Sequence, residues 1–150
     1  MDDLYHPRIL ELAADIPHLG RLDAPDGAST KVSRVCGSVV TVEVKLRDGV
    51  VSDIAVHPKA CALGQAATAV LAMHAIGATP NEIRAARDGL RAMLKEGARP
   101  PTGRFWELRH LEGVKDYPPR HTSTMLAFDA AVEALEKAGS HRAGVPAVSG

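Results

Sequence analysis

The chain has 150 residues, enough for one domain with a hydrophobic core, and its 45% hydrophobic and 24% charged residues are ordinary for a globular protein. Its 18 basic residues balance 18 acidic ones, and this zero net charge argues against the clustered basic surface that binds nucleic acid. No apolar stretch reaches the roughly 20 residues that span a bilayer, and the start MDDLYHPRIL lacks the apolar run of a secretory signal. We therefore expect a cytoplasmic protein that contacts neither nucleic acid nor membrane.

The first predicted element is a helix over residues 4–16, where apolar residues recur at helical spacing. Pro7 suits a first helical turn and Pro17 ends the helix. The segment HLGRLDAPDGAST that follows is rich in Gly, Pro and Asp, which predicts a loop. An extended stretch then runs to Cys36.

An antiparallel hairpin is predicted over residues 40–57. Val40, Val42 and Val44 alternate with polar residues, the period-2 pattern of a strand with one face in solvent. Asp48-Gly49 is a typical hairpin turn, and the alternation resumes after it.

Helices are predicted for the rest of the chain. The stretch ACALGQAATAVLAMHAIGA is rich in alanine and nearly uncharged, which predicts a helix buried on most sides. Thr79-Pro80-Asn81-Glu82 is a capped start for an amphipathic helix that Gly97 ends. A shorter helix or turn at FWELRHLEGV and a last amphipathic helix over residues 124–138 complete the pattern.

Strands precede helices in this order instead of alternating with them, which predicts the α+β class. We expect a small antiparallel sheet of about three strands, formed by the N-terminal third and packed against several helices. Residues 1–138 are expected to form a single domain. Residues 139–150 carry Gly, Ser and Pro and are expected to be a disordered C-terminal tail.

The chain contains two cysteines, too few for a disulfide scaffold. Each is therefore a packing residue, a metal ligand or a reactive thiol. Cys36 lies at a strand end before Gly37, whereas Cys61 opens a helix, where the N-terminal N–H groups and the nearby Lys59 favour a thiolate. Two thiols where a hairpin meets a helix suggest a metal or persulfide site, although their spacing is not that of a CxxC motif.

Histidines are the next candidate ligands. His57 ends the second hairpin strand four residues before Cys61 and could approach the same end of the sheet, and His121 lies just ahead of the last helix. His74 lies in the apolar helix, where a hydrogen-bonded core histidine is the more usual interpretation. The sequence contains no GxGxxG, P-loop, GxSxG or HEXXH motif, which argues against a nucleotide-binding protein, a serine hydrolase and a zinc protease.

Three segments, in order, carry a resemblance to a known family. The first is LYHPRILELAADIPHLGRLDAPD, the second VCGSVVTVEVKLRDGVVSDIAVHPKACALGQAATAVLAMHAIGAT, and the third LEGVKDYPPRHTSTMLAFDAAVEAL. They resemble the opening helix, the cysteine-bearing hairpin and helix, and the Pro-x-Arg segment of the IscU/SufU/NifU N-terminal family of iron–sulfur cluster assembly scaffold proteins. The additional TGRFWELRHLEGV places the chain nearest the SufU branch. The resemblance covers residues 4–138 and implies a SufE/NifU-like fold.

The family pattern also implies a ligand set of a cysteine, an aspartate two residues later, a second cysteine and a third. The resemblance places the two cysteines at Cys36 and Cys61, but the aspartate position is Ser38 and the third cysteine position is Ser123. Hydroxyl groups are poor ligands beside thiolate, imidazole and carboxylate. The resemblance therefore implies that Zn, Fe or a [2Fe–2S] cluster binds weakly or not at all, with His121 as the substitute third ligand.

The function implied is a scaffold or sulfur-transfer accessory protein, not an enzyme, that works with a SufS/IscS-like cysteine desulfurase and other iron–sulfur assembly components. Cys36 is the expected acceptor of persulfide sulfur and Cys61 the second choice, with weak Zn or Fe carriage as the companion role. Two alternatives stay open. The chain could be a ligand-poor interaction or regulatory subunit of the same machinery, or a dithiol redox protein that uses both cysteines.

Overall fold

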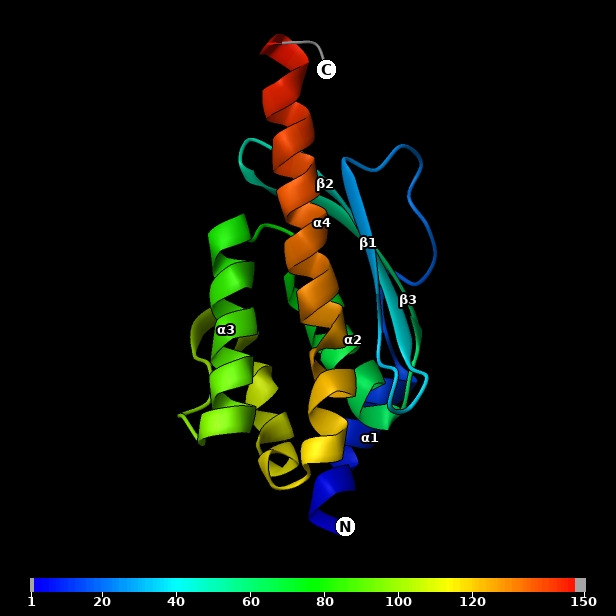
Figure 1. The fold of residues 1–150 in the computed structure, drawn as a ribbon, viewed down its shortest axis with the longest axis vertical. Coiled ribbons are helices and arrows are strands. Elements are labelled where there is room, and N and C mark those ends of the chain that lie inside the picture. Colours follow the sequence, from blue (N-terminus) through cyan, green and yellow to red (C-terminus); the bar gives the residue numbers. More distant parts are fainter. Residues whose placement is uncertain (1, 148–150) are drawn as a thin grey trace.

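The computed structural model describes residues 2–147, with side chains described for residues 4–139. The elements follow in the order α1 (Pro7–Ala14), β1 (Gly27–Val32), β2 (Val39–Arg47), β3 (Val50–Lys59), α2 (Ala62–His74), α3 (Pro80–Glu96) and α4 (His121–Ala147). Three 3₁₀ segments complete the described part of the chain, η1 (Asp2–Tyr5), η2 (Gly103–Asp116) and η3 (Pro118–Arg120). The strands form one antiparallel sheet in the order β1-β2-β3. The long helix α4 lies between this sheet and α3 (Figure 1). The predicted α+β class and three-stranded sheet are confirmed.

The β2–β3 hairpin forms as predicted, with one local change in the alternation. Asp48 and Gly49 adopt φ values of 55° and 79°, the left-handed conformations that a tight hairpin turn requires. A bulge after Lys45 leaves Ser52 without a strand partner. Because the extra residue changes the phase of the alternation, Val51 faces the core together with Ile54.

The outer face of the sheet is less exposed than the alternation predicted. Glu43 points away from the core on β2, yet it is only 3% exposed. Its carboxylate accepts hydrogen bonds from Arg21 Nε and from the Leu22 N–H, both at 2.7 Å. The loop before β1 therefore folds over this face, and Leu19 forms a bridge with Val56 on β3.

The first helix is shorter than predicted. Residues 2–5 form the separate 3₁₀ turn η1, and α1 starts at Pro7 and ends at Ala14. Proline lacks the N–H that a helix interior needs and disfavours helical geometry in the residue before it, so it marks the helix start. The His6 side chain accepts the Arg8 N–H and caps this start.

The last helix is longer than predicted. We expected it to end before Gly139, but α4 continues to Ala147, so residues 139–147 of the expected tail are helical and residues 148–150 lie outside the described residues. This stretch includes Gly139 and Gly144, and each glycine inside a helix costs about 1 kcal/mol relative to alanine. The buried residues of α4 extend as far as Ala138.

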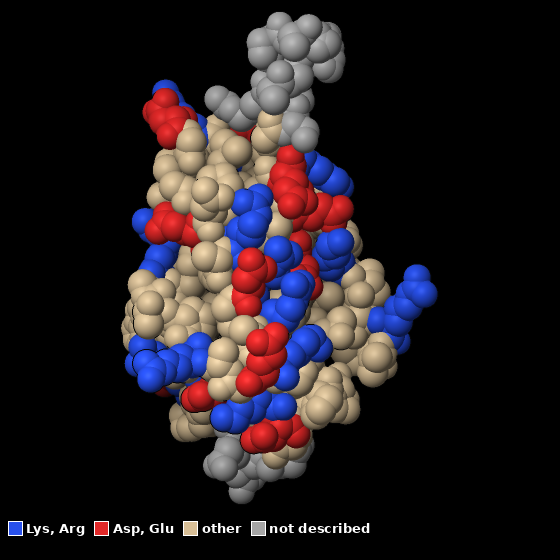
Figure 2. Space-filling model, turned by 60° about the vertical axis from the view of Figure 1, so that its left-hand side comes forward, with Lys and Arg blue, Asp and Glu red and all other residues tan. Residues whose placement is uncertain are grey.

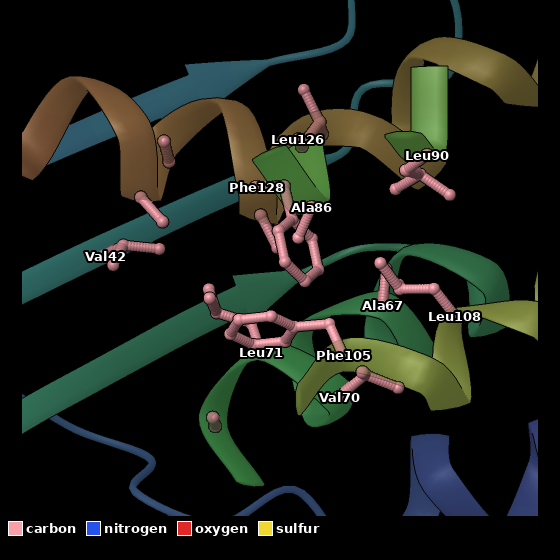
Figure 3. Close-up of a cluster of buried hydrophobic side chains, with 14 of the residues drawn as sticks. Val42, Ala67, Val70, Leu71, Ala86, Leu90, Phe105, Leu108, Leu126 and Phe128 are labelled. Atoms are coloured by element: carbon pink, nitrogen blue, oxygen red, sulfur yellow. The ribbon is translucent and has the colours of Figure 1, made fainter. Parts of the chain in front are cut away.

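The hydrophobic core joins the inner face of the sheet to α2, α3, α4 and η2. Figure 3 shows Phe105 and Phe128 facing each other beside Leu71 and Ala86, and their rings meet edge to face with centroids 5.5 Å apart. Almost every residue of α2 from Leu63 to Ala72 is buried, as its uncharged sequence predicted. The predicted capping box at the start of α3 is present, with Thr79 and Glu82 each accepting the other's backbone N–H.

Basic and acidic side chains are interspersed over the face in Figure 2, in keeping with the zero net charge. Ion pairs join many of them, including Lys31 with Glu133 and Arg87 with Asp88. Within residues 2–147, no helix combines the length and the apolar character needed to cross a membrane.

Candidate functional site

Cys36 lies in the turn between β1 and β2, a few residues beyond the strand end at which the sequence placed it. The turn is closed by the Ser33 N–H, which donates to the Ser38 carbonyl at 2.8 Å, and by the Gly37 N–H, which donates to the Ser33 carbonyl at 2.8 Å. Gly37 has a φ of 76°, a conformation that glycine adopts without steric cost. The turn presents Cys36 as an exposed, reduced thiol.

Two serine hydroxyls surround the sulfur of Cys36. Its Sγ lies 3.1 Å from Ser38 Oγ and 3.5 Å from Ser33 Oγ. Hydrogen bonds with Ser33 and Ser38 lower the pKa of the Cys36 thiol to about 7, because they stabilise the thiolate more than partial desolvation disfavours it. A lower pKa raises the share of Cys36 that is thiolate, the nucleophilic form, at neutral pH.

Cys61 is the N-cap residue of α2 and is partly exposed. No side chain caps this helix start, so its first N–H groups direct positive partial charge toward the site. The Cys61 sulfur lies 3.6 Å from Ser123 Oγ, which belongs to the first turn of α4 and is fully buried. The predicted placement of Cys61 at a helix opening is confirmed.

Ser123 links the two cysteines. Its hydroxyl donates to the Arg120 carbonyl at 3.2 Å and contacts Cys61, and it also helps to lower the pKa of Cys36. Gly64 on α2 allows α4 to approach this closely at Ser123, because a Cβ at position 64 would lie only 3.0 Å from the Ser123 carbonyl oxygen. The structure thus brings Cys36, Ser38, Cys61 and Ser123 to one place, at the end of the sheet where the β1–β2 turn lies.

His121 is hydrogen-bonded to backbone carbonyls of η2. It is 6% exposed, and its Nε2 lies 3.0 Å from the Val114 carbonyl and 3.2 Å from the Lys115 carbonyl. Since a carbonyl only accepts, Nε2 must carry the proton and donate it. The His121 ring therefore joins the start of α4 to the end of η2 through hydrogen bonds. His57, the other candidate ligand, is exposed on β3.

The residues at the site do not fit zinc or a [2Fe–2S] cluster. Over the described part of the chain, no three His, Cys, Asp or Glu side chains are grouped so that they could hold a metal ion. The groups that do converge are two thiols and the hydroxyls of Ser33, Ser38 and Ser123. Neutral hydroxyls provide neither the charge nor the ligand strength that these metals take from proteins.

A second polar cluster lies away from the thiols. Glu107 on η2 is 5% exposed and is paired with Arg8 of α1, and His74 lies 3.3 Å from its carboxylate. Burial alone would raise the pKa of Glu107, but hydrogen bonds from Arg8 and His74 outweigh it and lower the pKa. His74 is thus a hydrogen-bonded histidine, as expected, and the cluster ties α1 and α2 to η2.

Ser33 is the site residue that the sequence did not reveal. It is fully buried although it lies in a turn. Its hydroxyl accepts a hydrogen bond from the Cys36 thiol, and its backbone N–H and carbonyl close the turn. A serine three residues before a cysteine at the start of a turn is the signal that was available, since serine hydroxyls commonly bond within turns.

Known proteins are similar to this chain in sequence and in fold. The family model for the NifU-like N terminal domain matches residues 4–99. The crystal structure of a nitrogen-fixing NifU-like protein (N-terminal) from Brucella abortus superimposes with a TM-score of 0.91 at 49% identity, covering 93% of this chain and 96% of that one. Two proteins named iron–sulfur cluster assembly scaffold protein IscU are also similar. The one from Thermotoga maritima is 27% identical over 134 residues, or 89% of this chain and 94% of that protein, and the one from Streptococcus pyogenes serotype M1 is 24% identical over 140 residues, or 93% and 87%.

Proposed function

The chain belongs to the NifU-like N-terminal domain family and is similar to iron–sulfur cluster assembly scaffold proteins, and we propose that it works in iron–sulfur cluster assembly as an acceptor of persulfide sulfur. Cys36 is the acceptor, Cys61 is the second thiol of the site, and a cysteine desulfurase is the donor. The protein does not turn over a substrate of its own in this role. It receives a sulfur atom and holds it.

The observation that carries the proposal is the chemical state of Cys36. Its thiol is exposed, and its pKa of about 7 makes it substantially thiolate at neutral pH. Thiol–disulfide exchange is fastest when the pKa of the attacking thiol is near the ambient pH, because a lower pKa weakens the nucleophile and a higher one leaves it protonated. A sulfur acceptor needs this one activated thiol, whereas a metal site needs several charged ligands.

The transfer step follows from ordinary persulfide chemistry. The Cys36 thiolate attacks the outer sulfur of the donor's persulfide, and a new S–S bond forms at Cys36 Sγ. The S–S bond of the donor breaks at the same time, and the donor cysteine leaves as a thiolate. No electron is gained or lost overall, and no external oxidant or reductant is needed.

Metal carriage is less well supported by the same site. The two positions where the resemblance implies further ligands are Ser38 and Ser123, and both hydroxyls already contact a cysteine sulfur. Both serines are also nearly or fully buried, at 4% and 0% exposure. A metal ion would have to displace these contacts and would gain only neutral oxygen ligands in return.

The test of the proposal is sulfur uptake from a cysteine desulfurase supplied with cysteine. Wild-type protein is expected to gain the mass of a sulfur atom that a thiol reductant removes, Cys36→Ser to lose nearly all of this uptake, and Cys61→Ser to retain part of it. A wild-type protein that binds the desulfurase but gains no sulfur would overturn the proposal in favour of an interaction or regulatory subunit. A Cys36–Cys61 disulfide formed instead of the persulfide would favour the dithiol redox protein.

A further inference from the structure

The two edges of the sheet differ in how their backbone groups are satisfied. At the β3 edge, the Val56 N–H donates to the His18 carbonyl and the Val51 N–H to the Ala78 carbonyl, each at 2.9 Å, so neighbouring segments cover it. The strand β1 forms the other edge of the sheet. An unpaired strand edge presents a row of N–H and C=O groups that can pair with a further strand.

The register with β2 identifies the backbone groups of β1 that point outward. The Ser33 N–H donates to the Ser38 carbonyl at 2.8 Å, one step beyond the last residue pair of the two strands. Because hydrogen-bonded and non-bonded pairs alternate in an antiparallel ladder, the N–H and C=O groups of Ala28, Thr30 and Val32 point away from β2. No acceptor in the described part of the chain meets the N–H of Thr30 or Val32, and both residues are exposed.

Two copies of β1 can pair through these outward groups in a symmetric, antiparallel register. The register centred on Thr30 pairs residues 28–32 of one copy with the same residues of the other and places the two Thr30 residues opposite each other. Lys31, the one charged residue of β1, then faces Ser29 of the second copy. No like charges are opposed, and directly opposed threonines are a favourable cross-strand pair.

The same register gives Lys31 an acidic partner in the second copy. Within one chain, Lys31 Nζ lies 2.7 Å from Glu133 Oε1, and the Ser29 hydroxyl donates to that oxygen at 2.8 Å. Since Lys31 of one copy faces Ser29 of the other, it approaches the Glu133 carboxylate of the other copy. A hollow of about 410 Å³ beside Lys31 is lined by Asp129, Glu133 and Glu136 together with two arginines of α3, and leaves room for the second lysine. Within the described residues, the buried Asp129 Oδ1 in this hollow has no hydrogen-bond partner, so a further acceptor is present there.

We propose that the β1 edge is an interface for a second copy of this chain, which joins the two three-stranded sheets into one continuous sheet about a twofold axis at Thr30. This inference does not depend on the function proposed above. A contact confined to one pair of six-residue strands is small for a stable interface, so we expect a dimer that dissociates on dilution. Because the strands run antiparallel, the Cys36 turn of each copy would lie beside the start of β1 of the other.

Sedimentation velocity over a range of protein concentrations measures the interface, with a thiol reductant present to prevent disulfides between exposed Cys36 residues. Wild-type protein is expected to shift from monomer to dimer as its concentration rises. Thr30→Pro removes an outward N–H without removing a bond to β2. It deletes two hydrogen bonds per dimer, so we expect dimerisation to weaken about tenfold or more. Thr30→Val keeps the N–H and is the matched control, which should dimerise as wild type does.

Amide hydrogen exchange of the wild type, followed by NMR, tests the register without any substitution. The N–H groups of Thr30 and Val32 should exchange rapidly in dilute protein and become protected at high concentration, whereas those of Ser29 and Lys31, which point to β2, should be protected at both. Circular dichroism checks that the two variants are folded.

A wild type that stays monomeric at every concentration would overturn the inference, as would a dimer that folded Thr30→Pro leaves unchanged. Concentration-dependent protection that spares Thr30 and Val32 would place the interface elsewhere and would also contradict it. Protection of these two amides on dimerisation would support the β1 edge even if Thr30→Pro did not fold.

Discussion

Replacing Ser38 by Asp and Ser123 by Cys in one protein is expected to create a zinc site. Ser38 Oγ lies 3.1 Å from the Cys36 sulfur and Ser123 Oγ lies 3.6 Å from the Cys61 sulfur, so the new carboxylate and thiolate would stand beside the existing thiols. Three cysteines and one aspartate form a ligand set that zinc accepts. Structural zinc sites yield about 10–16 kcal/mol from four ligands, so two restored ligands should tighten zinc binding on the order of ten-thousand-fold.

Competition with a zinc chelator measures this change, and Ser38→Asp/Ser52→Cys is the matched control. It adds the same two groups, but Ser52 lies near the β2–β3 turn, at the opposite end of β2 from Cys36. The control should bind zinc no better than Ser38→Asp alone. Wild-type protein that binds zinc as tightly as the Ser38→Asp/Ser123→Cys protein would show that the hydroxyls are adequate ligands and would contradict our description of the site.

Gly27→Ala is expected to destabilise the fold strongly, although it adds only one methyl group. A Cβ at Gly27 would lie 1.9 Å from the Ala134 carbonyl oxygen and 2.8 Å from the Ala138 nitrogen, both backbone atoms of α4. Neither atom can move aside by a rotamer change, so β1 and α4 must separate. We expect a loss of stability on the order of 3–5 kcal/mol, or a fall in Tm of about 10 °C.

Urea and thermal unfolding followed by circular dichroism test this expectation. Gly139→Ala is the control, since Gly139 lies on α4 and a Cβ there would meet no atom within 4 Å. That variant should be as stable as wild type or more stable by up to about 1 kcal/mol. A Gly27→Ala protein with wild-type stability would mean that β1 and α4 do not approach each other as closely as described.

Local signals allowed much of the fold to be predicted. Three features depend only on neighbouring residues and form as expected: the Asp48-Gly49 turn, the Thr79 capping box and the buried helix α2. Contacts between distant segments could not be predicted in this way. Burial of Glu43 depends on a loop some twenty residues earlier, and Gly27 is needed only because α4 crosses β1 at that point.

The candidate site likewise combines local contacts, which the sequence predicts, with contacts between distant segments, which it does not predict. Cys36 and Ser38 are two residues apart and share one turn, so their proximity was readable from the sequence, whereas Cys61 and Ser123 are 62 residues apart and only the family resemblance brought them together. The expectation that His121 is a substitute ligand was formed without knowledge of the η2 carbonyls that lie 3.0 and 3.2 Å from its Nε2. Those partners are backbone atoms, which no side-chain pattern reveals.

The acceptor residue is identified by locating the transferred sulfur within the chain. Wild-type protein is incubated with a cysteine desulfurase and cysteine, its persulfides are blocked by alkylation, and its peptides are identified by mass spectrometry. We expect the extra sulfur first on the Cys36 peptide, and we expect Cys36→Ser to gain almost none at early times. Sulfur found first on the Cys61 peptide, or on neither, would contradict the assignment of Cys36 as the acceptor.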